Sequence, residues 1–299
     1  MNDEIIIKNM KTIRDMVRYG TTLLTKTELH YGHGYLNAKE EAVQICMHTL
    51  SLSFDCYEEF ANSRLLEEEK KDILYLIKER CYTRKPLAYL IKNAPFHGLD
   101  FYVDERVIVP RSFIGEILVN DGILPFLVHE PQNILDMCTG SGCLPIIAAH
   151  VFVQAHIDAI DISRQALEVA QINLDKYGLN ERIDLIQSDI YNSLNADYHK
   201  KYDLIISNPP YVSADSMDKL PREYQQEPSI ALHGGIDGMD IVKNIISNAK
   251  TFLKPKGILI IEIGNEYENI KAAFPKLPLV WIPVSAGEEQ VFLVHAKDL

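Results

Sequence analysis

Hydrophobic residues follow different spacings in the two parts of the chain. In residues 1–95 they recur three and four positions apart, as in "EIIIKNMKTIRDMVRYGTTLL", which is the spacing of a helix with one buried face. From residue 133 onward, short apolar runs such as "DLIIS" and "GILIIEI" alternate with helical segments such as "ISRQALEVAQINLDKYG". That alternation predicts parallel strands joined by crossover helices, which is an α/β fold.

Residues 96–112 separate the two patterns. The segment "FHGLDFYVDERVIVPRS" alternates aromatic and β-branched residues around Gly98 and ends near Pro110, which predicts a short β-hairpin. We therefore expect a helical domain over 1–95, a β-hairpin linker over 96–112 and a larger α/β domain over 113–299. Near the end, "PLVWIPV" and "EEQVFLVHA" have no helix between them, which predicts an antiparallel pair that closes the sheet.

The charged residues are distributed unevenly. Residues 1–95 contain 14 basic and 14 acidic side chains, so the formal net charge of −12 comes entirely from residues 96–299. A protein that binds nucleic acid usually carries a basic surface that neutralises phosphates, whereas this part of the chain is acidic. We therefore expect no direct recognition of nucleic acid, and we expect electrostatic attraction of a basic protein partner.

Other composition signals exclude several classes of protein. No apolar run approaches the ~18 residues that a membrane span needs, and the chain opens with acids rather than a basic signal region, so we expect a cytoplasmic protein. The five cysteines form no Cys-x-x-Cys pair, which favours buried free thiols over disulfides or zinc. His30 and His33 in "HYGHG" lie among glycines without nearby acid or thiol ligands, which favours a turn, and we predict no metal site.

The first predicted strand of the α/β part ends in "LDMCTGSGC". Gly140 and Gly142 allow a sharp turn and a close approach to a ligand, just before a helix whose N-terminus is electropositive. A nicotinamide-binding loop would have a small residue where Pro145 stands. Asp136, ahead of the glycines, would repel a pyrophosphate. The loop is therefore typical of a ligand that has no phosphate.

Two further predicted strands end in acidic residues. Asp161 in "AIDIS" can bind two ribose hydroxyls and can also cap the next helix, and Asp189 in "IQSDI" can accept a hydrogen bond from an adenine amino group. Because strand ends of a parallel sheet meet at one edge, these acids and Asp136 predict a pocket for a nucleoside that carries positive charge. S-adenosylmethionine fits, since its sulfonium and amino groups both favour nearby carboxylates.

The segment "DLIISNPPY" places Asn208 directly after a fourth predicted strand. Pro209 and Pro210 fix their own φ angles and remove two backbone donors, which leaves a rigid set of acceptors. The Asn208 side-chain oxygen and the Pro209 carbonyl can each accept a hydrogen bond from a planar NH₂ group, while the Tyr211 ring lies against its face. The motif predicts a site that orients an amide or an aromatic amine for methyl transfer, and no histidine base is required.

Simpler interpretations exist for both motifs. Gly140 and Gly142 can serve only as turn formers, and the two prolines can serve only to end a strand. The second interpretation explains the prolines but gives no use to Asn208 and Tyr211. A binding module that had kept the fold without activity would have lost part of the pocket, yet every expected polar group is present.

Together these segments resemble the class I methyltransferases that modify the side-chain amide of glutamine in proteins, and within them the branch acting on large-ribosomal-subunit protein L-three. Asn-Pro-Pro-Tyr alone is shared with adenine methyltransferases, but its combination with the other motifs is specific. The resemblance covers nearly the full chain. It rests on "YGHG" (31–34), "FYVDERVIVPRS" (101–112), "IGE" (114–116), "ILDMCTGSGC" (134–143), "DLIISNPPYV" (203–212) and "EYQQEPSIALHGGIDG" (223–238).

The resemblance implies a Rossmann-like domain that binds S-adenosylmethionine and releases S-adenosylhomocysteine. It implies that the glycine loop holds the methionine part of the donor, that strand-end acids hold the nucleoside, and that the Asn-Pro-Pro-Tyr motif holds the substrate glutamine. The implied donor residues are Asp136, Thr139, Gly140, Ser141, Gly142, Asp161, Asp189, Ile190 and Asn208, and the implied catalytic residues are Asn208, Pro209, Pro210 and Tyr211. Ile190 stands where a related branch has an aromatic residue against the adenine.

The resemblance also implies that residues 1–95 recognise the substrate protein. Ribosomal proteins are basic, so the acidic part of this chain would speed the encounter, with a rate that falls as salt rises. An enzyme acting on peptide chain release factors would share the fold and the chemistry, and only the N-terminal domain and the details of "YGHG" and "DERVIVPRS" point away from it. A DNA adenine methyltransferase would need a basic target-recognition region, which the charge pattern disfavours.

Overall fold

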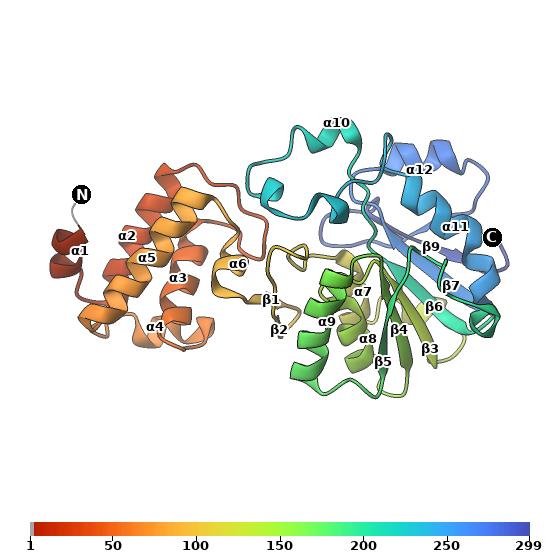
Figure 1. The fold of residues 1–299 in the computed structure, drawn as a ribbon, viewed down its shortest axis with the longest axis horizontal. Coiled ribbons are helices and arrows are strands. Elements are labelled where there is room, and N and C mark those ends of the chain that lie inside the picture. Colours follow the sequence, from red (N-terminus) through yellow and green to blue (C-terminus); the bar gives the residue numbers. More distant parts are fainter. Residues whose placement is uncertain (1–2) are drawn as a thin grey trace. The chain divides into compact units, whose positions relative to one another are not determined.

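The computed structural model describes residues 3–299, which divide into two compact units (Figure 1). Unit 1 contains the described residues up to Asn93 together with Pro221–Gln226, and unit 2 contains Ala94–Leu220 and Glu227–Leu299. The chain therefore passes from unit 2 into unit 1 and back within one loop. None of the helices between residues 3 and 299 is long and apolar enough to cross a membrane.

Unit 1 is helical, as the spacing of its hydrophobic residues predicts. Its core is built around α2, α3 and α5, whose buried faces include Met16, Ile45 and Ile77. The helices are α1 (Asp3–Asn9), α2 (Ile13–Lys26), α3 (Ala38–Thr49), α4 (Tyr57–Phe60), α5 (Glu67–Thr83) and α6 (Leu87–Ile91), with a 3₁₀ helix, η1 (Phe54–Cys56).

Side chains at the helix starts satisfy backbone donors that have no partner inside the helix. Thr12 and Asp15 form a reciprocal capping box at α2, and the Asn37 side chain accepts hydrogen bonds from two backbone amides of α3. The acidic run Glu67, Glu68 and Glu69 occupies the first turn of α5, as expected from its favourable interaction with the helix dipole. Local sequence signals therefore determine where these helices begin.

A buried ion pair joins two helices of unit 1. Arg80 of α5 is fully buried, and its guanidinium donates two hydrogen bonds to Glu41 of α3, from Nε at 2.9 Å and from Nη2 at 3.1 Å. The same guanidinium donates to the backbone carbonyls of Arg84 and His30. Since its fork of donors is used in a fixed geometry, the pair is well satisfied despite its burial.

Unit 2 begins with a short β-hairpin, whose strands lie within residues 94–101 rather than across the expected 96–112, and continues into an α/β sheet. Strands β1 (Ala94–Phe96) and β2 (Leu99–Phe101) pair antiparallel around Gly98, whose φ is +78°. The sheet strands are β3 (Asn133–Met137), β4 (His156–Asp161), β5 (Ile183–Gln187), β6 (Tyr202–Ser207), β7 (Leu253–Glu262), β8 (Val280–Trp281) and β9 (Val291–His295). Their order is β5-β4-β3-β6-β7-β9-β8.

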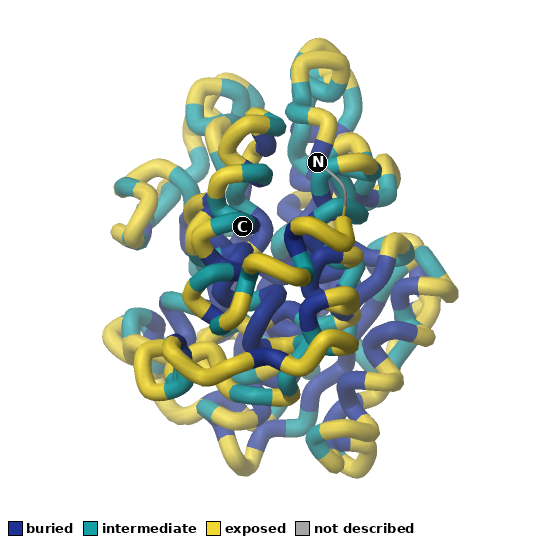
Figure 2. The backbone as a smooth tube through the Cα atoms, turned by 90° about the vertical axis from the view of Figure 1, so that its left-hand side faces the viewer, coloured by how far each residue is buried: buried dark blue, intermediate teal, exposed yellow. Residues whose placement is uncertain are grey.

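The strands from β3 to β7 are parallel, and β9 pairs antiparallel with both β7 and β8. This arrangement confirms the predicted α/β fold and its antiparallel edge. Every residue of β6, the strand beside β3, is buried. Figure 2 shows exposed residues in yellow, many of them on loops. Near-continuous apolar strands such as β6 are typical of a parallel sheet covered on both faces.

Helices cover the sheet of unit 2. The larger core contains residues of α11 and α12, such as Ile245 and Ile270, packed with strand residues, while α7, α8 and α9 contact one another and the sheet. The helices are α7 (Phe113–Val119), α8 (Cys143–Val151), α9 (Arg164–Tyr177), α10 (Ala214–Met217), α11 (Asp240–Phe252) and α12 (Tyr267–Ala273). The 3₁₀ helices are η2 (Leu124–Phe126), η3 (Ala196–Tyr198), η4 (Tyr224–Gln226) and η5 (Ser229–Ala231).

All five cysteines are free thiols, but only two of them are buried. Cys46 and Cys143 lie in the interior, where burial raises the pKa of each thiol to about 12. Cys56, Cys81 and Cys138 are partly exposed. The expectation of free thiols is confirmed, and the expectation that all of them are buried is wrong because three lie on segments that border solvent.

Replacing Arg80 by Ala should strongly destabilise unit 1. The change leaves the Glu41 carboxylate buried without its partner, which costs about 3–5 kcal/mol in comparable cases. Urea unfolding followed by circular dichroism would measure the loss.

The matched control is Arg14→Ala, because Arg14 forms an ion pair with Glu58 in which both side chains are more than half exposed. Loss of that pair should cost no more than about 1 kcal/mol. Equal unfolding midpoints for the two variants would contradict the structural role assigned to Arg80.

Candidate functional site

A cavity of about 480 Å³ opens at the carboxyl ends of the parallel strands in unit 2. Residues that follow four neighbouring strands line it: Cys138 and Gly140 after β3, Asp161 at the end of β4, Ser188, Asp189 and Ile190 after β5, and Asn208 and Pro210 after β6. A cavity of this size is in the range of small-molecule sites, and the edge of the sheet where it lies is the usual ligand position in α/β folds.

The sequence-predicted residues divide into those that line the cavity and those beside it. Gly140, Asp161, Asp189, Ile190, Asn208 and Pro210 are lining residues. Among the described residues, Asp136, Thr139, Ser141, Gly142, Pro209 and Tyr211 do not line it, and all of them lie within four residues of ones that do. The structure thus brings the predicted segments together at one edge of the sheet.

The glycine loop turns sharply between β3 and α8. Gly140 and Gly142 have φ angles of +56° and +78°, which L side chains rarely adopt. A Cβ on Gly142 would also come within 3.1 Å of the Ala170 Cβ on α9. The loop conformation therefore requires glycine at position 142 for two independent reasons.

The Asp161 carboxylate holds this loop and the start of α9 in place. Its Oδ2 accepts a hydrogen bond from the Gly140 amide at 2.9 Å, and its Oδ1 accepts one from the Ser163 amide at 2.8 Å. The helix cap is Ser163, whose hydroxyl accepts from the Ala166 amide, so the expectation that Asp161 itself caps α9 is wrong by two positions. Each carboxylate oxygen retains acceptor capacity for a ligand.

Asp136, in β3, is a buried acid without a well-formed hydrogen bond among the described residues. Its side chain is fully buried, and neither carboxylate oxygen accepts a hydrogen bond of good geometry. Burial raises the pKa of Asp136 to about 8; the Thr139 hydroxyl opposes this shift, and the Asp161 charge adds to it. Asp136 lies two residues before the cavity-lining Cys138, and a buried carboxyl without a well-formed hydrogen bond there favours a ligand that carries a cationic group.

The Asn-Pro-Pro-Tyr motif directly follows β6. The Ser207 hydroxyl, at the end of this strand, donates a 2.9 Å hydrogen bond to the Met137 carbonyl of β3, which fastens the base of the motif to the central strand. Asn208 and Pro210 face the cavity, and both prolines are buried. The side chain at position 208 is thereby presented beside two buried prolines whose φ angles are fixed.

Glycines from later segments pack closely against the same motif. A Cβ on Gly264 would lie 2.6 Å from Cε2 of the Tyr211 ring, and one on Gly238 would lie 2.2 Å from the Tyr211 carbonyl oxygen. The Tyr211 ring therefore rests against the backbone after β7. Contact between this ring and a substrate stays a prediction.

A second wall of the cavity comes from two segments outside the strand ends, residues 106–108 and 229–233. Arg111 and Glu227 connect them through two 2.6 Å hydrogen bonds between guanidinium and carboxylate. Glu227 also accepts a hydrogen bond from the Val109 amide at 2.9 Å. This bidentate pair fixes the spacing of the two segments that form the wall.

Several residues that organise the site escaped the sequence reasoning. The Asn173 amide on α9 donates to the carbonyls of Ser141 and Tyr102, so it joins the glycine loop to the hairpin segment. Glu262 at the end of β7 accepts from the Ser112 hydroxyl and the Phe113 amide, and burial raises its pKa to about 7. Both side chains act across long sequence separations, for which no local pattern exists.

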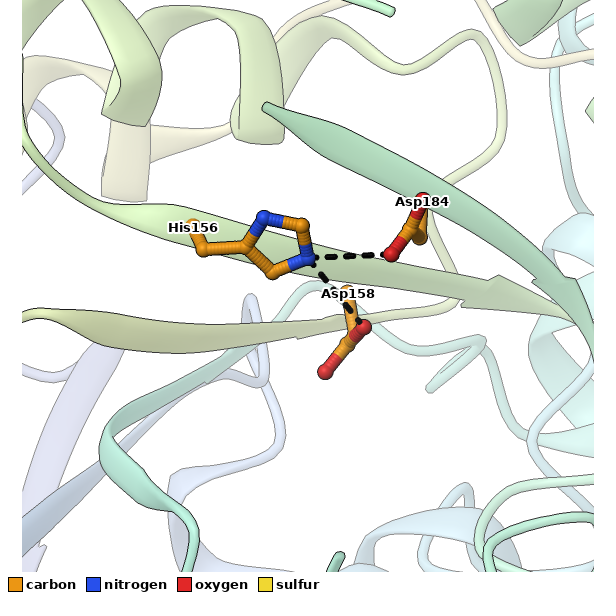
Figure 3. Close-up of side chains that lie close together, drawn as sticks. All are labelled: His156, Asp158 and Asp184. Atoms are coloured by element: carbon orange, nitrogen blue, oxygen red, sulfur yellow. Dashed lines mark hydrogen bonds and ion pairs between the residues drawn. The ribbon is translucent and has the colours of Figure 1, made fainter. Parts of the chain in front are cut away.

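A separate cluster, at the amino ends of the strands and opposite the cavity, resembles a metal site. His156, Asp158 and Asp184 lie at the amino ends of β4 and β5, with His156 Nε2 2.9 Å from an Asp184 oxygen and 3.9 Å from an Asp158 oxygen (Figure 3). Lys201 and the Tyr202 hydroxyl already bind the other oxygen of Asp158. The cluster is thus explained as an ion-pair network that ties β4, β5 and β6 together.

Replacing Asp136 by Asn should stabilise the ligand-free protein near pH 8. The ordinary pKa of 3.8 applies to the unfolded chain, and the folded value is about 8. Between these values the unfolded state releases a proton that the folded state keeps, so the wild-type protein loses stability as pH rises from about 4 to about 8. The asparagine variant lacks this loss, and its Tm at pH 8 should exceed that of the wild type by several degrees.

Thermal unfolding of the ligand-free protein at pH 5 and pH 8 measures this difference. Asp189→Asn is the matched control, because it removes an exposed carboxyl from the same cavity and should leave the Tm nearly unchanged. A lower Tm for Asp136→Asn at pH 8 would mean that Asp136 is ionised and stabilised in the empty site.

Comparison with known proteins identifies relatives along nearly the whole chain. The family model "Methyltransferase small domain" matches residues 121–222. The ribosomal protein uL3 glutamine methyltransferase of Burkholderia pseudomallei is 51% identical over 97% of this chain and 96% of its own length. The enzyme of the same name from Neisseria gonorrhoeae is 46% identical over 98% of this chain and 97% of its own length.

Among solved structures, the human methyltransferase 10 domain containing protein is 14% identical, covers 66% of this chain and 88% of its own, and has a TM-score of 0.48. The sequence relatives establish the family, because they are 46–51% identical over nearly the whole chain and nearly their own full length. The chain belongs to the family of ribosomal protein uL3 glutamine methyltransferases.

Proposed function

We propose that this protein transfers a methyl group from S-adenosylmethionine to the side-chain amide nitrogen of a glutamine in ribosomal protein uL3, the large-subunit protein L-three. The observation that carries the proposal is the position of Asn208 and Pro210 on a cavity whose other strand ends present acids and a glycine loop. The named activity of the relatives supports the same substrate. Because that substrate is a ribosomal protein, we expect the enzyme to work in the cytoplasm.

The donor half of the cavity fits S-adenosylmethionine, which supplies an electrophilic methyl group when bound. The cationic centres of this donor match the unpartnered buried Asp136, and no basic side chain suited to a phosphate lies among the strand-end residues that line the cavity. We assign the donor subsite to Asp136, Thr139, Gly140, Ser141, Gly142, Asp161, Asp189, Ile190 and Asn208. Within it, Asp161 and Asp189 are the acceptors for the nucleoside.

The acceptor half is assigned to Asn208, Pro209, Pro210 and Tyr211. An amide nitrogen is a weak nucleophile because its lone pair is delocalised, so its orientation decides the rate. The Asn208 side-chain oxygen and the Pro209 carbonyl accept hydrogen bonds from the two N–H groups of the glutamine amide, and their partial negative charge stabilises the nitrogen as it becomes positive. The methylated amide is acidic enough to release its proton without a dedicated base.

The direct test is transfer of labelled methyl from S-adenosylmethionine to purified uL3 and, in parallel, to a peptide chain release factor. Mass spectrometry of glutamine-containing peptides would locate the label. Label on uL3 alone supports the proposal. Label on the release factor alone would keep the chemistry and overturn the substrate.

Replacing Asn208 by Ala should abolish turnover and leave donor binding largely intact. Loss of an acceptor that acts mainly in the transition state lowers kcat by about 10²–10³. Single-turnover methylation of uL3 and calorimetric binding of S-adenosylmethionine measure the two effects separately. A fall in donor affinity as large as the fall in rate would assign Asn208 to donor placement instead.

Replacing His233 by Ala should change kcat less than about tenfold. His233 lines the cavity and is exposed, so it is a side chain that could act as a base. Removal of a general base typically lowers the rate by a factor of about 10²–10⁴, so loss of a catalytic base would exceed the change expected for His233→Ala by about tenfold or more. The pH dependence of kcat in both proteins tests this: a loss above about 100-fold, with a changed pH profile, would establish a histidine base.

A further inference from the structure

The loop after the Asn-Pro-Pro-Tyr motif contributes to both units. It leaves unit 2 after Leu220, belongs to unit 1 over Pro221–Gln226 and returns to unit 2 at Glu227. Residues on both sides of this excursion line the cavity: Ala214 and Met217 of α10 before it, and residues 229–231 and His233 after it. Residues 221–226 therefore lie within the segment whose two ends line the cavity.

Glu223 is the buried centre of the excursion. Its side chain is fully buried and forms an ion pair with Arg84, whose Nη2 lies 2.8 Å from a Glu223 oxygen; Nη1 of Arg80 lies 3.9 Å from the same oxygen. Arg80 also binds Glu41, so two arginines face two glutamates. Because the charges balance, the burial of Glu223 is compensated as long as the loop keeps Glu223 beside Arg84 and Arg80.

The adjacent Tyr224 fits into the "HYGHG" segment. Its ring centroid is 4.3 Å from that of His33 and 5.5 Å from that of His30. Gly32 has a φ of +145°, and a Cβ on it would lie 2.6 Å from the Tyr224 hydroxyl oxygen. The glycine and the two histidines thus form a receptor for one tyrosine side chain, which explains a motif that the methyl-transfer chemistry does not use.

The loop has other fixed points within unit 2. The Val212 amide donates to the Leu232 carbonyl at 2.8 Å, and the Gly234 amide donates to the Val212 carbonyl at 2.9 Å. After the excursion, Glu227 is held by Arg111. The segment 213–220, which contains α10, lies between the Val212 bonds and the Glu223–Tyr224 anchor. Release of that anchor would give this segment the conformational freedom of a much longer loop.

We propose that Glu223 and Tyr224 are positioning residues for the methyl transfer: their docking in unit 1 holds α10, and with it the Ala214 and Met217 side of the cavity, in the geometry that receives the substrate. This inference rests on the proposed function. It gives residues 223 and 224 a part in shaping the acceptor site. The donor residues at the strand ends do not depend on the anchor.

The test compares Tyr224→Ala and Glu223→Gln with two controls. Tyr224→Phe keeps the ring between the histidines, and Lys219→Ala alters an exposed residue of the same loop. The measurements are kcat and KM for uL3, the dissociation constant of S-adenosylmethionine, and amide hydrogen exchange of residues 213–220 in each full-length protein.

The alanine and glutamine variants should lower kcat/KM for uL3 by about tenfold or more, leave donor affinity within about threefold, and speed exchange in residues 213–220. Both controls should match the wild type. Wild-type exchange and kcat/KM in Tyr224→Ala and Glu223→Gln would overturn the inference, as would equal losses in donor binding and rate. Failure of the wild-type enzyme to methylate uL3 would instead overturn the proposed function, and the exchange measurement would still report on the anchor.

Discussion

Parallel pairing of β3, β4, β5 and β6 is the constraint on which the site depends. Met137 pairs with Ile160 and Ser207, and Asp161 pairs with Gln187, so all four strands end at one edge. The residues that follow them have no sequence proximity, yet the backbone hydrogen bonds of the sheet bring them together. The glycine loop, the strand-end acids and the Asn-Pro-Pro-Tyr motif therefore meet at one cavity because the register of the strands brings them together.

The parts of the site that could be predicted from the sequence are those with local signals. Asp161 ends one apolar strand and Asn208 follows another, and both strands can be recognised by their composition. Arg111 and Glu227 have no such signal, because their pairing depends on how two distant loops meet. The same holds for Glu223, which looks like one acid among many in a polar segment and is fully buried.

Two buried acids, Glu41 and Asp136, differ in whether the protein itself supplies a hydrogen-bond partner. Glu41 receives two hydrogen bonds from Arg80, so its burial is compensated within the helical unit. Asp136 receives none of good geometry, and burial raises its pKa. A site that leaves an acid unpartnered loses stability in the empty state and gains discrimination, since a ligand without a cationic group cannot restore the missing interaction.

The insertion of Pro221–Gln226 into unit 1 has a consequence for biosynthesis. Arg84 leaves the ribosome long before Glu223, and at a synthesis rate of about 5–20 residues per second the delay between them is on the order of ten seconds. During that interval the nascent helical unit has its arginine pair and its "HYGHG" receptor without the segment that fills them. The N-terminal unit therefore completes its fold only after most of the catalytic unit has been translated, which makes the order of synthesis and the order of folding different in this chain.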